Sequence, residues 1–95
     1  MPGSMTKSTK LLRGYSLHPA QCRMARAALQ LGVRDLAKAA EVSPTTVADF
    51  EGGKRLPHPR TLAAIRAALE AAGVELIAEN GGGAGVRLAR SASAE

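Results

Sequence analysis

The sequence predicts a mainly α fold, in which four helices are followed by a C-terminal β-hairpin. Apolar residues recur at helical spacing in four segments between residues 19 and 72. Alanine, the strongest helix former, is frequent, and the 95 residues include one tyrosine and one phenylalanine, so the helices must pack closely around a thin core. After residue 73 the apolar residues alternate, as they do in strands, around a glycine-rich turn at 80–83.

These patterns divide the chain into four regions. We expect residues 1–15 to form a flexible basic arm, because this stretch is polar, lacks apolar periodicity and carries Lys7, Lys10 and Arg13. Residues 16–73 are expected to form the helical domain, and residues 74–88 the hairpin. Residues 89–95 are small and polar, and a disordered tail is expected there.

The first helix is predicted to begin at His18-Pro19, since proline is favoured at the first position of a helix. We expect it to end near Leu31-Gly32. Its buried stripe consists of apolar residues at helical spacing: Cys22, Ala25, Ala28 and Leu29.

Two short helices joined by a tight turn are predicted between residues 33 and 53. Gly32 is the expected N-cap of the first of them. The inner face of this helix consists of four apolar residues at helical spacing: Val33, Leu36, Ala37 and Ala40. Glu41-Val42 is expected to form the turn that follows.

The second helix of this pair has clear start and stop signals. Ser43 is the predicted N-cap and Pro44 takes the first helical position. Val47 and Phe50 are expected to point inward. The helix should end where Gly52 or Gly53 adopts the left-handed conformation.

The fourth helix and the hairpin complete the domain. His58-Pro59 starts the helix, Gly73 stops it, and its apolar stripe is Leu62, Ile65, Leu69 and Ala72. Strands are predicted at 74–78 and 85–88. An isolated hairpin is marginally stable, so this one must pack on the helices, pair with a second chain, or both. The residues expected to mediate dimerisation are Val74, Leu76, Ile77, Val86 and Leu88, because alternation leaves Ile77 facing outward.

Charge and composition limit the function classes. The net charge of +5 suits a polyanionic partner such as nucleic acid. A single cysteine allows neither an intrachain disulfide nor a four-cysteine metal site, and no apolar run approaches the ~20 residues of a membrane span. We therefore expect a protein of the cytoplasm and nucleoid that has no cofactor, no metal and no membrane partner. The two histidines precede prolines at helix starts, which favours capping over catalysis.

The pair of short helices between residues 33 and 53 has the features of a DNA-reading unit. Ala37 is small enough for close helix approach. Three polar residues are expected to be exposed on the second helix: Thr45, Thr46 and Asp49. Positive side chains flank them in sequence, with Arg34 before the turn and Lys54-Arg55 after the helix. Free N–H groups at the helix start favour phosphate.

The segment from residue 19 to residue 72 resembles the Cro/phage-repressor (XRE) helix-turn-helix family. The resemblance rests on Leu36-Ala37, Val42-Ser43, Val47, Phe50-Glu51 and Gly53-Lys54-Arg55. The closing pattern GVELIAENGGGAGVRL is similar to a short subgroup of such regulators that carry a C-terminal hairpin. The resemblance implies that base edges are read by Pro44, Thr45, Thr46 and Asp49. It implies that the DNA backbone is contacted by Val33, Ser43, Gly53, Lys54 and Arg55.

Three positions depart from the pattern of this family. Val33 stands where a polar residue, often glutamine, is usual, so Arg34 is expected to supply the phosphate contact. Glu41 stands where glycine is usual, and a positive φ there would cost on the order of 1 kcal/mol. Asp49 places a carboxylate toward the groove, where it would accept from a cytosine amino group, hold a basic side chain, or repel phosphate.

The sequence thus predicts a non-enzymatic protein that binds double-stranded DNA. The favoured interpretation is a small transcriptional regulator, a repressor, that binds a pseudo-palindromic operator as a homodimer with half-sites ~34–36 Å apart. The alternative is an antitoxin-like protein-interaction module that also regulates its own gene through DNA binding. No small-molecule ligand is indicated by the sequence.

Overall fold

The computed structural model describes residues 17–89, and within them the chain forms four helices and a two-stranded hairpin. The helices are α2 (Pro19–Leu29), α3 (Val33–Ala40), α4 (Pro44–Glu51) and α5 (Pro59–Ala72), and the strands are β1 (Val74–Ile77) and β2 (Gly85–Leu88). The predicted fold class is confirmed. The expected arm at 1–15 lies outside the described residues, as do residues 90–95 of the tail expected at 89–95; Ala89 is described, and its N–H bonds to the Gly73 carbonyl at 2.8 Å.

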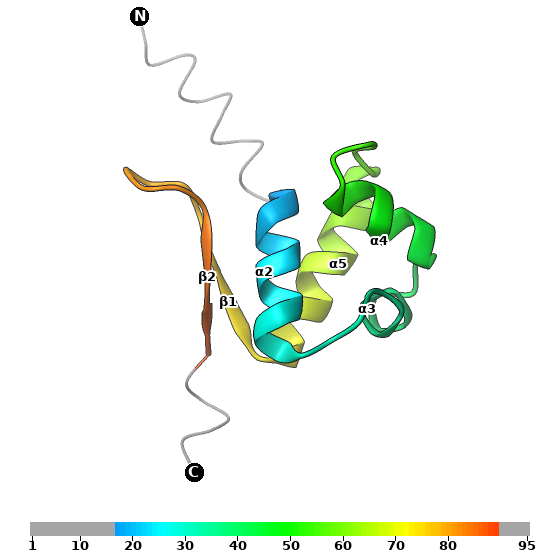
Figure 1. Cartoon of the computed structure of the whole chain (residues 1–95), viewed down its shortest axis with the longest axis horizontal. Helices are drawn as coiled ribbons and strands as arrows, with labels where there is room; N and C mark the ends of the chain where they lie inside the picture. The colour runs from blue at the N-terminus through cyan, green and yellow to red at the C-terminus, as the bar shows by residue number, and fades with distance from the viewer. Residues whose placement is uncertain (1–16, 90–95) are drawn as a thin grey trace, which may run out of the picture.

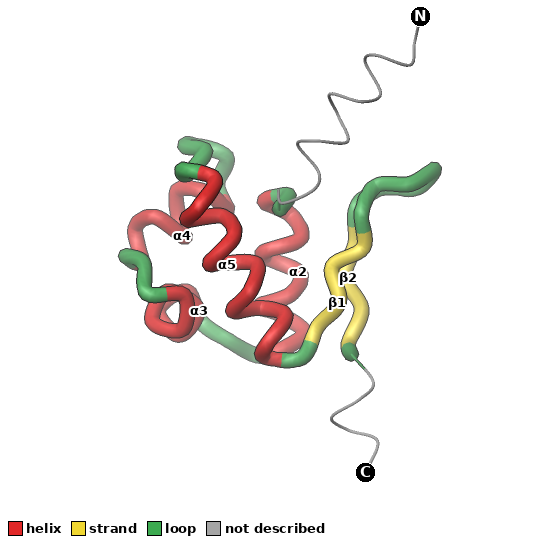
Figure 2. The backbone as a smooth tube through the Cα atoms, turned by 180° about the vertical axis from the view of Figure 1, so that it is seen from behind, coloured by secondary structure: helices red, strands yellow, loops and turns green. Residues whose placement is uncertain are grey.

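The helices all lie on one side of the hairpin (Figure 1). The hairpin packs on the first and last helices, with β2 beside α2 and β1 beside α5. The α3 and α4 pair lies at the far end of the helical layer, away from the strands, as the view from behind also shows (Figure 2). The hairpin and the α3–α4 pair therefore occupy opposite ends of a protomer whose longest extent is 44 Å.

Helix α2 begins as predicted and ends earlier than predicted. The Nδ1 atom of His18 accepts a hydrogen bond from the Ala20 N–H at 3.2 Å, and the Gln21 side chain accepts from the His18 N–H at 2.9 Å. The helix ends at Leu29 because Gln30 adopts the left-handed conformation, with φ 60°. The helix therefore stops two residues before the expected end near Leu31-Gly32, and Gly32 is the N-cap of α3, as expected.

The core lies where α2, α3, α4 and α5 meet. Its largest fully buried side chains are Phe50, Leu36, Ile65, Leu69, Val47 and Cys22. Two alanines predicted to be buried are exposed, Ala28 and Ala72. Ala72 is the last residue of α5, where the chain turns away toward β1, and the face of α2 that is buried includes Gln21 rather than Ala28.

A partly buried ion pair joins α2 to the end of α4, with the Arg26 side chain 21% exposed and the Glu51 side chain 7% exposed. The Glu51 carboxylate receives two hydrogen bonds from the Arg26 guanidinium, both at 2.7 Å, and one from the Cys22 thiol at 3.1 Å. Arg23 donates to the Glu51 backbone carbonyl. Burial raises the pKa of the Cys22 thiol, and its bond to Glu51 raises that pKa further, so this cysteine is a protonated core residue.

Gln21 links helix α2 to both strands of the hairpin through hydrogen bonds. It is 4% exposed, and its Nε2 lies 3.0 Å from both the Ile77 and Gly85 carbonyl oxygens. These carbonyls belong to opposed residues of β1 and β2, so one amide group holds both strands. A buried amide left without these partners would cost about 1–3 kcal/mol. The sequence patterns gave Gln21 no role, because a single glutamine on a helix carries no periodic signal.

In the observed hairpin register, the five residues expected to mediate dimerisation differ in how far each is buried within its own chain. Val74 is buried in the core of its own chain, and Leu76 and Val86 pack against that core. Ile77 is half-buried opposite Gly85, whereas Leu88 is 60% exposed. The first strand ends at Ile77, one residue before the predicted end. Three of the five residues are thus used within the protomer, which leaves Ile77 and Leu88 for any partner.

Candidate nucleic-acid interface

The turn between α3 and α4 sets the geometry of the site. Glu41 has φ 61°, and its N–H bonds to the Lys38 carbonyl at 3.2 Å. The Val42 N–H bonds to the Ala37 carbonyl at 2.9 Å, which closes the end of α3. Glu41 thus keeps the positive φ that the glycine usual at this position would take. A residue with a side chain therefore occupies a backbone conformation that favours glycine.

The strain at Glu41 leads to the first testable prediction. Glu41→Gly should raise the free energy of unfolding by about 1 kcal/mol, because glycine takes positive φ without a steric cost. Equilibrium urea unfolding measures this change. The matched control is Ala39→Gly, at an exposed position inside α3, where the same residue should instead lower stability by about 1 kcal/mol. A loss of stability in both variants would contradict the assignment of strain to Glu41.

The start of α4 is exposed and well capped. Ser43 is the N-cap, and its Oγ accepts from the Thr46 N–H at 3.1 Å. The same Oγ lies 2.9 Å from the Thr46 hydroxyl. Pro44 and Thr45 are exposed on the first turn, whereas Thr46 and Asp49 are half-buried. Thr45 is therefore exposed as expected, whereas Thr46 and Asp49 are exposed only in part, and the bond to Ser43 holds the Thr46 hydroxyl against the helix start.

The end of α4 presents two cations. Gly53 takes φ 75°, and the Lys54 N–H bonds to the Asp49 carbonyl at 2.8 Å, which turns the chain back across the helix end. Lys54 and Arg55 are exposed, and so is Arg34 on the first turn of α3. The ion pairs found among residues 17–89 use other arginines, so these three cations keep their charged groups in solvent.

A cleft connects the start of α4 with the start of α5. It has a volume of about 390 Å³, and Ser43, Thr46, Arg55, His58 and Thr61 are among the residues that line it. His58 caps α5 by accepting from the Arg60 N–H at 3.0 Å, as Ser43 caps α4. Two helix N-termini therefore border one cleft that Arg55 also lines, and the positive ends of helix dipoles favour anions.

The sequence patterns gave His58 and Thr61 no part in this site. Their signal was present, because Ser43-Pro44 and His58-Pro59 are both N-cap and first-position pairs. Nothing in the chain, however, indicated that the two helix starts would border the same cleft. That proximity depends on how α5 packs against α3 and on the path of the loop between α4 and α5.

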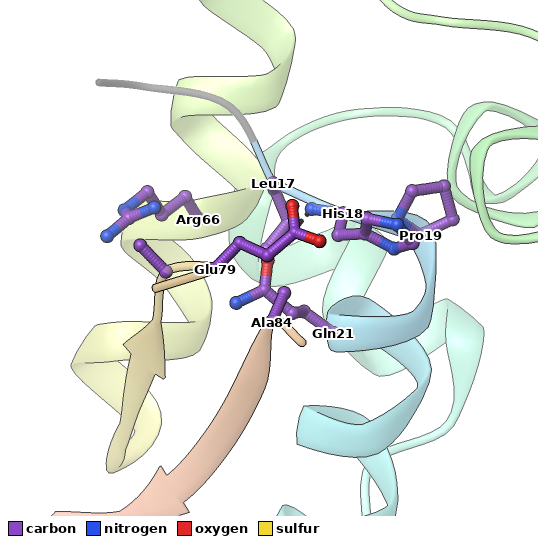
Figure 3. A pocket seen from close by; sticks show the side chains of 8 residues that line it. Leu17, His18, Pro19, Gln21, Arg66, Glu79 and Ala84 are labelled. Carbon is purple, nitrogen blue, oxygen red and sulfur yellow. Dashed lines mark hydrogen bonds between the residues drawn. The ribbon is translucent and has the colours of Figure 1, made fainter. Parts of the chain in front are cut away.

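A smaller cavity lies away from this interface. It has a volume of about 200 Å³ and forms where the hairpin loop meets the start of α2 and the middle of α5 (Figure 3). Leu17, Pro19 and Ala84 supply apolar surface, and the side chains of Arg66 and Glu79 line it as well. None of the residues of α4 lines this cavity.

The described residues include no candidate metal site and no helix suited to crossing a membrane. Within residues 17–89 there is no cluster of three histidine, cysteine or acidic side chains that could hold a metal ion. Over the same range, none of the helices is both long enough and apolar enough to cross a membrane.

Comparison with known proteins agrees with the geometry. A family model described as a helix-turn-helix domain matches residues 20–79, which span all four helices and the first strand. No curated protein matches the chain. A helix-turn-helix domain implies DNA binding. Since the match covers more than half of the sequence, the chain belongs to the helix-turn-helix domain family.

Proposed function

We propose that this protein is a transcriptional regulator, a repressor, that binds a specific double-stranded DNA operator as a homodimer in the cytoplasm and nucleoid. One observation carries the proposal: exposed cations precede and follow the exposed first turn of α4 in the sequence. Thr45 lies on that turn, Arg34 precedes it in sequence, and Lys54 and Arg55 follow the helix. A helix presented in this way fits the major groove while the cations contact phosphates on either side.

The contacts divide into two groups. Pro44 and Thr45 supply a methylene surface, a methyl group and a hydroxyl to base edges, and Thr46 and Asp49 border the same face. The Asp49 carboxylate suits a cytosine amino group, which donates in the major groove. The residues in the second group are proposed to contact the DNA backbone, and they are Arg34, Ser43, Gly53, Lys54 and Arg55. These contacts fix the orientation of the protein without reading sequence.

The cleft between α4 and α5 adds a second support for phosphate binding. The starts of α4 and α5 and the residue Arg55 border it. A DNA strand that runs along this cleft would place a phosphate close to positive dipole ends and a cation. The side chain of Val33 cannot take part in such a contact, and the exposed Arg34 beside it replaces that function.

Selection of bound sequences from random duplex DNA tests the proposal. We expect an inverted repeat, with half-sites one helical turn or a multiple of it apart. Fluorescence anisotropy on the selected duplex should then give a steep salt dependence. Three cations per protomer correspond to a slope of log K against log salt of about −5 for a dimer. A pool without enriched sequence, or affinity that does not change with salt, would contradict the proposal.

A further inference from the structure

The outer edge of β2 carries backbone groups without partners among the described residues. The Ala89 N–H bonds to the Gly73 carbonyl at 2.8 Å, which fixes the alternation of the antiparallel ladder. In the observed register the N–H and C=O groups of Gly85 and Arg87 then point toward β1. Those of Val86 and Leu88 point the other way, to the free edge.

An apolar surface lies beside this edge. Leu88 opposes Val74, so both side chains leave the hairpin on the face toward the helices. Val74 is 3% exposed, but Leu88 is 60% exposed, because its own helices do not reach it. Helix α2 runs alongside β2 (Figure 1) and presents Met24, which is 40% exposed, on the same face as Gln21. Ala28 continues this face one turn later.

The outer face of the hairpin has a different character. Glu75 and Arg87 oppose each other there and form an ion pair of 2.8 Å with both side chains exposed. The neighbouring pair is Ile77 and Gly85, which offers one half-buried apolar side chain. An ion pair in solvent favours a hydrated surface, so this face is poorly suited to a dry contact.

We propose that the free edge of β2 is the dimer interface and that its partner is β2 of a second copy of this chain. Antiparallel pairing of the two edges gives a continuous four-stranded sheet, in which each Val86 and Leu88 backbone finds hydrogen-bond partners. Met24, Ala28 and Leu88 of each copy are then covered by the other. The edge is suited to this use, since β2 contains neither proline nor lysine.

The symmetry of this pairing connects it with DNA binding, and the inference rests on the proposed function in that respect. Two identical antiparallel edge strands are related by a two-fold axis perpendicular to the sheet. Because all helices of a protomer lie on one side of the hairpin, both copies place their helices on the same side of the joint sheet (Figure 1). Both α4 helices lie at the end of the helical layer away from the strands, so they face one DNA duplex together.

Charge at Arg87 restricts the register of the pairing. With Arg87 on the two-fold axis, two guanidinium groups would face each other across the strands, which is destabilising. An axis at Val86 instead places Arg87 opposite Gly85 of the second copy and Leu88 opposite Ala84 of the second copy. This register keeps each Arg87 beside its own Glu75.

Two lysine substitutions test the interface by sedimentation equilibrium. Leu88→Lys and Met24→Lys should each raise the dimer dissociation constant by about tenfold or more, because an unpaired ammonium group would be buried. The matched control is Leu56→Lys, at a 77% exposed position in the loop before α5, which should leave the dimer unchanged. A wild-type protein that sediments as a monomer, or equal dissociation in all three variants, would overturn the proposal.

Hydrogen exchange locates the interface independently of substitutions. In the wild-type dimer the Val86 and Leu88 amides should be protected, and dilution to the monomer should remove that protection. The Arg87 amide, which pairs with β1, should stay protected in both states. A dimer in which the Val86 and Leu88 amides exchange freely would overturn the assignment to this edge.

DNA-binding measurements distinguish a failure of the proposed dimer interface from a failure of the proposed function. A monomeric Leu88→Lys protein that binds one half-site weakly, with unchanged sequence preference, would support both the edge interface and the reading of bases by α4. A stable edge-paired dimer that binds no DNA would support the interface and contradict the proposed function. A monomer that binds single half-sites as tightly as full operators would overturn the interface alone.

Discussion

Glu51→Ala should lower the free energy of unfolding by about 3–5 kcal/mol, because it leaves the charge of Arg26 partly buried without its partner. The Glu51 carboxylate accepts both Arg26 hydrogen bonds and the Cys22 thiol, and its side chain is 7% exposed. A domain of this size has a total stability near the low end of about 5–15 kcal/mol, so the variant should be largely unfolded at moderate temperature. Urea unfolding followed by circular dichroism measures the loss.

Glu70→Ala is the matched control for this change. Glu70 also pairs with an arginine, Arg66, but that pair lies on the surface of α5, with the Glu70 side chain 46% exposed. An exposed pair of this spacing contributes about 0.3–0.5 kcal/mol. Similar losses in the two variants would mean that burial does not strengthen the contribution of Glu51.

The same carboxylate makes stability depend on pH. Burial alone would raise the pKa of Glu51, but the hydrogen bonds from Arg26 and Cys22 and the two nearby arginines outweigh it, so the pKa is lowered. A lowered folded-state pKa means that the native state holds the ionised form more strongly than the unfolded state does. This stabilisation is present above the ordinary value of 4.5 and is lost as the pH falls through the folded-state pKa.

Glu51→Gln isolates the contribution of ionisation, since glutamine keeps the shape of the side chain. As the pH falls below about 4.5, the free energy of unfolding should decrease more steeply for the wild-type protein than for this variant. Urea midpoints across this range measure the two slopes. Parallel slopes would show that acid sensitivity arises from other carboxyl groups.

Thr45→Ala and Lys54→Ala should weaken DNA binding in different ways. Thr45 lies on the exposed first turn of α4, and its loss should relax discrimination at one base pair by about 1–3 kcal/mol. Lys54 follows Gly53 at the helix end, and its loss should weaken binding to all sequences and reduce the salt slope by about 1 for each contact. Anisotropy titrations on the selected operator and its single-base variants measure both effects.

Arg66→Ala controls for the loss of one positive charge. Arg66 lines the separate cavity beside the hairpin loop and pairs with Glu70, away from α4. Its removal should leave sequence preference intact and change the salt slope little. If Thr45→Ala and Lys54→Ala both reduced affinity equally on every sequence, the role of α4 in reading bases would be contradicted.

Local signals in the sequence predicted most of the fold because they act over a few residues. Ser43, His18 and His58 cap helices as expected, since a side-chain acceptor followed by proline is a short-range pattern. Val74 and Leu76 lie on one face of the hairpin and Ile77 lies on the other, as the alternation of apolar residues predicted. The turn at Glu41-Val42 was predicted from the sequence, whereas the positive φ of Glu41 was suggested only by the resemblance to a family in which glycine is usual there.

Contacts between distant segments could not be predicted in the same way. Gln21 and Glu51 are polar residues whose burial depends on partners 56 and 25 positions away in the chain. Helical periodicity treats such residues as surface, and it also assigned Ala28 and Ala72 to the core. In the candidate site, the exposed cations were predicted from their positions in the sequence beside the two short helices. The bond between Ser43 and Thr46, and the cleft shared with α5, required the packing of the helices.

Because Cys22 is hydrogen-bonded to Glu51, its thiol can serve as a natural probe of local unfolding between α2 and α4. The thiol is fully buried and protonated, so an alkylating reagent can react with it only in molecules where α2 has separated from α4. Since the sequence contains one cysteine, the labelling rate, divided by the rate of an unfolded peptide thiol, gives the population of opened molecules directly. Addition of operator DNA would then reveal, without any introduced label, how strongly binding at α4 suppresses that opening.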